Sequence, residues 1–378
     1  MTKVLFIADG YPGKKSPTNL FIKNQAVALN ERGIQIGVLV VDIRSIRRIR
    51  KLGFYKSMID DIPVWHISFP WGGFFPGIAQ HIYNILGKWA YSRIQMVYGR
   101  PDLLHSHFGG AGIIGAKIKT KYGVPLVITE HGSKMLPQSK DHQHKTRVLN
   151  EAYRISDGLI AVSSTLANFI KGYGVEKVVV IPNIIPSHYF LHGKESACNK
   201  KKQFISVGNL LPNKRFDLVI LAFKKICNLK DDVTLCIVGD GPLFNDLSKL
   251  IVKEKIENKV IMLGFVKNSD LPELYRNSMC FVLASEYETF GVVYAEALAS
   301  GIPVIATDCG GPSDIVNKYN GLLIEKNNVE ALFDAMYYMY ENHANYNSDA
   351  IINDCHNRFG EEAVIKSIME VYEDILHN

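Results

Sequence analysis

Short apolar runs alternate with helical stretches along the whole chain, and this alternation limits the folds open to it. Strands that alternate with helices form parallel sheets, because each helix returns the chain to the edge where the previous strand began. The runs fall into two series, separated by a polar stretch between Ser187 and Lys202. We therefore expect two α/β domains, each with its own parallel sheet. The predicted strands span residues 3–8, 35–41, 64–68, 103–105, 126–129, 158–162 and 178–181, and then 203–207, 234–238, 259–263, 280–283, 303–306 and 321–324, with helices such as 20–31 and 165–171 between them.

Length and composition agree with two domains in the cytoplasm. A chain of 378 residues exceeds one ordinary core, and a hydrophobic content of 47% can fill two. The first apolar run reaches Asp9 too soon for a secretory signal. The aromatic stretch 71–91 is broken by polar residues, so we do not expect it to span a membrane. The six cysteines all lie in the second half without metal-ligand spacing, which indicates reduced thiols in a cytoplasmic protein.

Two glutamates, Glu288 and Glu296, lie in a segment that is otherwise mostly small or apolar. A lone glutamate is more often a solvated surface residue, but neither of these belongs to a charged face. The predicted strand 280–283 and a helix that begins after Gly291 place Glu288 at the carboxyl end of a strand, where ligands of open α/β sheets bind. The backbone amides near Phe290 and Gly291 can bind phosphate there. Glu296 lies two turns into the helix, and a carboxylate at such a site can accept hydrogen bonds from a ribose diol or a sugar ring.

The segment 285–306 resembles the signature of the family 4 retaining glycosyltransferases, which have the GT-B fold. The resemblance implies two Rossmann-like domains that face each other across a ligand-binding cleft. The acceptor-side domain would span residues 1–186 and the nucleotide-sugar-binding domain residues 187–360, with a last helix at about 361–378 that packs back on the first domain. Further segments follow the family's order over nearly the whole chain: 204–220, 238–242, 263–265 and 308–311 in the second half, and Tyr11-Pro12, 21–29, 105–107, 129–132, 161–163 and 181–183 in the first.

The resemblance also implies how the second domain would bind its donor. Glu296 would hold the ribose hydroxyls, and Glu288 the sugar hydroxyls. Lys214 would meet the diphosphate, together with the amides near Phe290 and Gly291.

Two donor-side positions depart from the family's pattern, and two histidines match it. Asn209 stands where the family usually has Arg, and Arg215 stands where it usually has Gly. The first departure removes a charge that would stabilise the leaving group, and it is open whether Arg215 replaces that charge. In the first domain, His131 matches a position that reaches the donor sugar at the reacting carbon. His107 matches a position nearer the cleft wall.

The activity implied is transfer of a hexose or N-acetylhexosamine from a nucleoside diphosphate sugar, preferably a UDP-sugar, with retention at the anomeric carbon. The catalytic residues would be His131, Glu288 and Lys214. No Asp-x-Asp metal motif is present, so we expect activity without a metal or another cofactor. Two alternatives stay open: a nucleotide-sugar epimerase on the same fold, and a non-catalytic nucleotide-sugar-binding protein. A dehydrogenase is disfavoured, because no Gly-x-Gly-x-x-Gly follows the first strand.

Positive charge is concentrated in the first half of the chain. Residues 1–190 hold 24 Lys and Arg against 11 Asp and Glu, whereas residues 191–378 hold 19 against 26. A cluster of cations precedes the aromatic-rich stretch, which suits the surface of an anionic membrane. The alternative is a solvated basic helix beside a buried aromatic cluster, and no recognition motif for nucleic acid is present. The cations of this predicted membrane patch are Arg44, Arg47, Arg48, Arg50 and Lys51.

The basic first domain leads to an expectation about the acceptor. A cationic, aromatic surface at a membrane favours an acceptor that is itself held in the membrane. We therefore expect a lipid-linked glycan, as in surface polysaccharide biosynthesis, and a peripheral location at the inner face of the cytoplasmic membrane.

Overall fold

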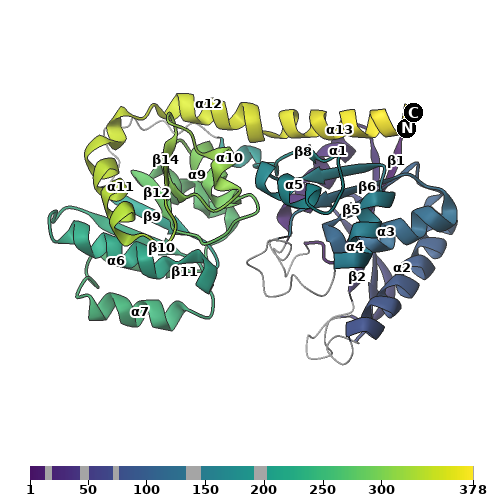
Figure 1. Cartoon of the computed structure of the whole chain (residues 1–378), viewed down its shortest axis with the longest axis horizontal. Coiled ribbons are helices and arrows are strands. Elements are labelled where there is room, and N and C mark those ends of the chain that lie inside the picture. Colours follow the sequence, from purple (N-terminus) through teal and green to yellow (C-terminus); the bar gives the residue numbers. More distant parts are fainter. Residues whose placement is uncertain (13–18, 43–50, 71–75, 133–145, 191–201, 378) are drawn as a thin grey trace. The chain divides into compact units, whose positions relative to one another are not determined.

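The computed structural model describes residues 1–12, 19–42, 51–70, 76–132, 146–190 and 202–377. The chain divides into two compact units: Met1–Ile184 with Val364–Asn378, and Ile185–Ala363. Each unit has its own sheet with helices packed against it (Figure 1). The predicted α/β class is therefore confirmed. Every predicted strand is present, and its ends differ from the prediction by at most two residues.

The first unit is built on a sheet whose order, within the described residues, is β3-β4-β2-β1-β5-β6-β7-β8. All neighbouring strands run parallel except β3 and β4 at one edge. The strand order reverses between β1 and β5, and ligands of open sheets bind beyond the carboxyl ends of the strands at such a point. The strands are β1 Lys3–Ala8, β2 Gln35–Asp42, β3 Gly53–Ile59, β4 Ile62–Ser68, β5 Leu103–His107, β6 Leu126–Glu130, β7 Gly158–Ala161 and β8 Val179–Val180.

Strand β3 was not predicted. The alternative interpretation of the cationic segment was a solvated basic helix, and the described part of that segment forms a strand instead. Asp60 and Asp61 both have positive φ, 47° and 60°, and they join β3 to β4 in a two-residue turn. Two central residues with positive φ match the twist of an antiparallel hairpin. The alternation of outward and inward side chains from Phe54 to Ile59 then suits an edge strand.

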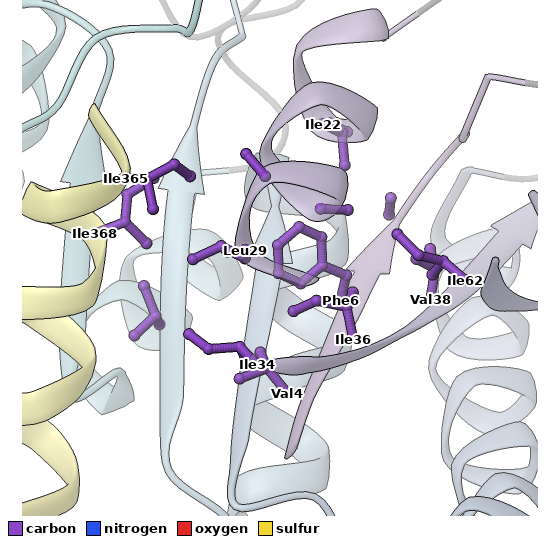
Figure 2. Packing of buried hydrophobic residues seen from close by; sticks show 14 of the residues in the cluster. Val4, Phe6, Ile22, Leu29, Ile34, Ile36, Val38, Ile62, Ile365 and Ile368 are labelled. Atoms are coloured by element: carbon purple, nitrogen blue, oxygen red, sulfur yellow. The ribbon is translucent and has the colours of Figure 1, made fainter. Parts of the chain in front are cut away.

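The helices of the first unit cover its sheet, and one of them comes from the far end of the chain. Val364, Ile365, Ile368 and Tyr372 of the last helix are buried in the core cluster of this unit. Figure 2 shows Ile365 and Ile368 directed from that helix into the cluster that includes Leu29 and Val4. The helices are α1 Leu20–Glu31, α2 Pro76–Tyr98, α3 Phe108–Tyr122, α4 Thr146–Ile155, α5 Ser164–Lys171 and α13 Glu361–His377.

The second unit is built on a fully parallel sheet of order β11-β10-β9-β12-β13-β14 in the described residues. Its strand order reverses between β9 and β12. The strands are β9 Gln203–Val207, β10 Thr234–Val238, β11 Val260–Gly264, β12 Cys280–Leu283, β13 Val304–Thr307 and β14 Gly321–Ile324. The helices are α6 Phe216–Cys227, α7 Phe244–Lys253, α8 Leu271–Arg276, α9 Val292–Ala299, α10 Pro312–Ile315, α11 Val329–Asn342 and α12 Ser348–Phe359.

Candidate active site

Two of the predicted donor-side residues meet where the strand order of the second unit reverses. Lys214 follows β9 and Glu288 follows β12, and these two strands are neighbours in the sheet. The Lys214 Nζ forms an ion pair with Glu288 Oε1, and the Ser285 Oγ donates a hydrogen bond to the same oxygen at 3.0 Å. The Lys214 and Glu288 side chains are only 18% and 11% exposed. A charged pair that is shielded in this way interacts more strongly than one in open solvent.

The backbone around Glu288 is held by the loop that follows β13. The Glu288 N–H donates to the Cys309 carbonyl at 3.2 Å, and the Gly311 N–H donates to the Glu288 carbonyl at 2.9 Å. A Cβ at Gly311 would lie 2.3 Å from the Phe290 carbonyl oxygen, so only glycine allows the two loops to approach this closely. The loops after β12 and β13 therefore fix Glu288 together.

Phe290 and Gly291 connect Glu288 to helix α9. The Phe290 side chain is buried, and its ring packs edge to face against Phe359 at 5.6 Å between centroids. Gly291 has a φ of 96° and precedes the first turn of α9. The first N–H groups of a helix have no partner within it and can bind an anion. Any contact of Phe290 with a donor would thus come from its backbone, because its side chain belongs to the core.

Glu296 lies in the second turn of α9 and is almost fully buried. It is 5% exposed. Asn268 Nδ2 and the Tyr275 hydroxyl donate to its two carboxylate oxygens, each at 3.4 Å, and the Tyr189 hydroxyl also contacts it. Burial raises the pKa of Glu296 to about 7, and the hydrogen bonds from these three residues oppose the rise. Sequence reasoning missed these partners, which come from two separate segments, Tyr189 from one and Asn268 and Tyr275 from the other.

Asn209 and Arg215 lie on either side of Lys214 in the sequence, but the structure gives them different surroundings. The Asn209 side chain is exposed just after β9. The Arg215 guanidinium donates to Asp217 at 2.9 Å and to Glu286 at 3.1 Å, and it also contacts Asn327. Two carboxylates therefore already engage the Arg215 charge. Donor binding by Asn209 and Arg215 stays a prediction.

The two predicted histidines of the first unit lie side by side. His107 ends β5 and His131 follows β6, and their Nδ1 and Nε2 atoms are 3.1 Å apart. Burial lowers the pKa of His131 to about 3 and the pKa of His107 well below its ordinary value. His105 stacks on His107, with ring centroids 4.4 Å apart, and burial lowers the pKa of His105 to about 3 as well. All three imidazoles are therefore neutral near pH 7 and can exchange hydrogen bonds but carry no charge.

Glu130 orients the backbone at His131. Its Oε1 accepts hydrogen bonds from the His131 and Gly132 N–H groups at 2.9 and 2.7 Å, and its Oε2 accepts from the Tyr153 hydroxyl at 2.7 Å. Burial raises the pKa of Glu130, and these hydrogen bonds oppose the rise. Sequence reasoning assigned Glu130 no role, although it lies within the segment 129–132 that carries the family resemblance.

Of the predicted membrane patch, only Lys51 falls within the described residues. Arg44, Arg47, Arg48 and Arg50 lie outside them. Lys51 is exposed, and its Nζ lies 4.5 Å from the centre of the Tyr55 ring. Among the residues that the structure describes, no group of three or more His, Cys, Asp or Glu could hold a metal ion. In the same part of the chain, no helix has the length and apolar character that a membrane crossing needs.

Comparisons with known proteins identify the family to which the chain belongs. Residues 190–354 match the family described as Glycosyl transferases group 1, and residues 19–188 match Glycosyltransferase Family 4. An uncharacterized glycosyltransferase of Methanocaldococcus jannaschii is 29% identical over 279 residues, which are 72% of this chain and 76% of the relative. The N-acetyl-alpha-D-glucosaminyl L-malate synthase of Bacillus anthracis is 29% identical over 301 residues, 73% of this chain and 76% of the relative.

Solved structures share the fold over the full length. Sucrose-phosphate synthase from Thermosynechococcus elongatus matches with a TM-score of 0.81 at 17% identity, over 100% of both chains. Anabaena HepE in complex with UDP matches with a TM-score of 0.76 at 21% identity, over 99% of this chain and 100% of that chain. Both comparisons agree with the resemblance that the motifs indicated. This chain therefore belongs to the family 4 glycosyltransferases and has the GT-B fold.

Proposed function

We propose that this chain is a retaining glycosyltransferase that moves a hexose or N-acetylhexosamine from a nucleoside diphosphate sugar to a glycan acceptor. Its family supports the reaction class, and a related chain is named as a sugar transferase, the phosphatidylinositol N-acetylglucosaminyltransferase GPI3 subunit of Saccharomyces cerevisiae. HepE was solved with UDP and with UDP-glucose, which supports a UDP-sugar as the donor.

The observation that carries the proposal is the Lys214–Glu288 ion pair between the ends of β9 and β12. A donor needs a cation for its diphosphate and a hydroxyl acceptor for its sugar, and this pair supplies both at adjacent positions. Glu288 would accept hydrogen bonds from the sugar hydroxyls, and Lys214 would turn toward the diphosphate. Glu296 would accept hydrogen bonds from the ribose hydroxyls.

Lys214 would act mainly on the transition state. Negative charge grows on the diphosphate as the bond to the anomeric carbon breaks, so a cation beside it stabilises the transition state more than the bound donor. The N–H groups at the start of α9 would also stabilise the negative charge on the diphosphate. Because these groups supply positive charge, we expect the reaction to proceed in EDTA. The departing phosphate would take the proton of the acceptor hydroxyl.

His131 would contact the donor sugar as a neutral group. An imidazole whose pKa lies near 3 does not protonate a leaving group at neutral pH, but it can hydrogen-bond a sugar hydroxyl. Glu130, which holds the backbone N–H of His131, would keep that position fixed. His107, at 3.1 Å from His131, would set which nitrogen of His131 carries its proton.

The acceptor we propose is a lipid-linked glycan, in surface polysaccharide biosynthesis. The support is the distribution of charge, with an excess of 13 cations in residues 1–190. A cationic domain brings the enzyme to an anionic membrane, where such an acceptor is held. The enzyme would then be peripheral, at the inner face of the cytoplasmic membrane.

The test is donor turnover by two variants, measured with UDP-sugars and a membrane extract as the source of acceptor. Lys214→Ala should lower kcat about 100-fold or more, as the loss of one charge-stabilising donor does in other enzymes. Glu296→Gln should mainly raise the donor KM, because its contact is made in the ground state as well. Lys225→Ala is the matched control, since Lys225 also pairs with a glutamate, Glu330, but on the surface.

Three outcomes would contradict the proposal. Wild-type turnover by both Lys214→Ala and Glu296→Gln would mean that these residues do not form the donor site. An altered sugar released from the donor alone would indicate an epimerase. Binding of UDP-sugar without release of UDP, in the presence of acceptor, would indicate a non-catalytic binding protein.

A further inference from the structure

Helix α2 carries exposed apolar side chains at helical spacing on the face that points away from the sheet. Ile85, Trp89 and Val97 are 48%, 42% and 73% exposed; Trp89 lies four residues after Ile85, and Val97 lies eight residues after Trp89. Arg93 occupies the position between Trp89 and Val97, and its guanidinium lies 5.5 Å from the centre of the Trp89 ring. The solvent face of a surface helix is normally polar. The exposed apolar side chains on this face of α2 therefore indicate a binding surface.

The same surface continues onto the edge strand β3. The Phe54 ring packs edge to face against Trp89, with ring centroids 5.3 Å apart. Phe54, Lys56 and Met58 point to one side of β3, because side chains alternate along a strand. Met58 is 58% exposed. We call this region the α2–β3 surface and define it by Phe54, Lys56, Met58, Ile85, Trp89, Arg93 and Val97.

The α2–β3 surface lies in a part of the sequence almost without acids. Between Ile43 and Pro101 the chain has nine Lys and Arg but only two acids, Asp60 and Asp61, which form the hairpin turn. Asp60 is already paired with Lys23 at 2.7 Å. The surface thus combines exposed aromatic and aliphatic side chains with cations that acids in this stretch do not neutralise.

We propose that the α2–β3 surface docks on an anionic lipid membrane. Trp89 and Phe54 would enter the interface between headgroups and acyl chains, and Lys56 and Arg93 would contact the lipid phosphates. Aromatic rings beside cations suit this interface, because one part of the surface is apolar and the other part attracts negative charge. A second copy of the chain fits less well, since two such cationic faces would repel each other. The proposal rests on the lipid-linked acceptor of the proposed function and names the surface that would approach it.

The test is co-sedimentation of the full chain with phosphatidylglycerol–phosphatidylcholine vesicles and with phosphatidylcholine vesicles. The wild type should sediment with the anionic vesicles and much less with the neutral ones, and high salt should weaken the difference. Trp89→Ser and the double variant Lys56→Glu/Arg93→Glu should each reduce binding. A cation near an anionic surface contributes about 1 kcal/mol, so each lost cation should weaken binding about fivefold, and the two added carboxylates should weaken it further.

Matched controls come from the second unit. Phe265 is 67% exposed, and Lys318 lies 4.8 Å from the centre of the Tyr319 ring, so Phe265→Ser and Lys318→Glu remove equivalent groups elsewhere. Both controls should bind vesicles like the wild type. The thermal midpoint of each variant shows that it is folded. Since Lys56 and Arg93 are exposed, their double variant changes the charge of the surface without removing a buried side chain.

Several results would overturn this assignment. Wild-type vesicle binding by Trp89→Ser and by Lys56→Glu/Arg93→Glu would place the membrane contact elsewhere. A wild-type dimer that these substitutions dissociate, without vesicle binding, would assign the surface to a second copy. Donor turnover with a water-soluble acceptor separates this inference from the proposed function. If the chain turns over the donor but does not bind vesicles, only the membrane docking of the α2–β3 surface is rejected. If it binds vesicles but does not turn over the donor, only the proposed glycosyl transfer is rejected.

Discussion

Glu288 and Glu296 belong to one short segment, yet their surroundings give them different chemistry. Glu288 pairs with a lysine and accepts a hydrogen bond from Ser285. Glu296 has no lysine or arginine among the three residues that contact it, and burial raises its pKa to about 7. A carboxyl group with that pKa is partly protonated at neutral pH. Its ability to accept hydrogen bonds from a ribose diol therefore depends on pH.

We expect the affinity for a UDP-sugar to fall as the pH is lowered through 7. Only the ionised form of Glu296 can accept both hydroxyl hydrogen bonds, so protonation competes with the donor. Between pH 8 and pH 6, the Kd should rise about tenfold for a pKa of about 7. Isothermal titration calorimetry with UDP-glucose can measure it, because the phosphates of a nucleotide sugar stay ionised in this range.

The control is Glu296→Gln, which should bind more weakly but with the same Kd at both pH values. His131 does not titrate in this interval, since its pKa lies near 3. A wild-type Kd that is unchanged from pH 8 to pH 6 would refute the role of Glu296.

The sequence indicated residues in the loops that follow strands but not the partners that these residues contact. Lys214 and Glu288 each follow an apolar run, and neighbouring parallel strands bring such ends together. Ser285 lies close to Glu288 in the sequence, but no pattern indicated that its hydroxyl would hydrogen-bond to Glu288. Tyr189 and Asn268 reach Glu296 from distant segments, and their approach depends on tertiary packing that no local pattern contains.

At the scale of elements, the parallel strands of both sheets were predicted, and the antiparallel edge strand β3 was not. Strands β9, β10, β12 and β14 have the predicted bounds, because each is a short and mostly apolar run. Strand β3 mixes lysine, serine and aromatic residues, since one of its edges and much of its surface face solvent. Its hairpin signal was the pair Asp60-Asp61, which adopts positive φ without a glycine.

We expect Gly311→Ala to disturb both stability and turnover. Its Cβ would lie 2.3 Å from the Phe290 carbonyl oxygen and 2.4 Å from the Phe290 Cα, so the backbone itself must move. Such overpacking typically costs about 1–3 kcal/mol. Because the same loop holds Glu288, kcat should also fall. Thermal unfolding and donor turnover measure the two effects.

Gly264→Ala is the comparison, because a Cβ at Gly264 meets nothing within 4 Å and only its φ of 69° opposes the change. It should cost about 1 kcal/mol and leave turnover unchanged. If Gly311→Ala were as mild as Gly264→Ala, the contact between the loops after β12 and β13 would not fix Glu288.

At the scale of the whole molecule, the first unit is discontinuous in sequence. Helix α13 supplies Val364, Ile365, Ile368 and Tyr372 to a core whose other members precede residue 185. Tyr372 also hydrogen-bonds His105, which stacks on His107. The family resemblance implied the return of this helix, whereas its amphipathic pattern alone would fit packing on either unit. The stability of the first unit therefore depends on the last residues of the chain.

We expect Ile365→Ala and Ile368→Ala to destabilise the first unit selectively. Ile365 and Ile368 are buried in that unit, and each truncation should cost about 2–5 kcal/mol. Calorimetry should show a transition that shifts down with either variant, since separate units need not unfold together. A UDP-sugar at 100 times its Kd should instead raise the transition of the second unit, by about 2.7 kcal/mol in free energy of unfolding. Ile261→Ala, at a side chain that is 47% exposed on β11, should move neither transition. A uniform shift of the whole unfolding curve by Ile365→Ala would show instead that the two units unfold as one.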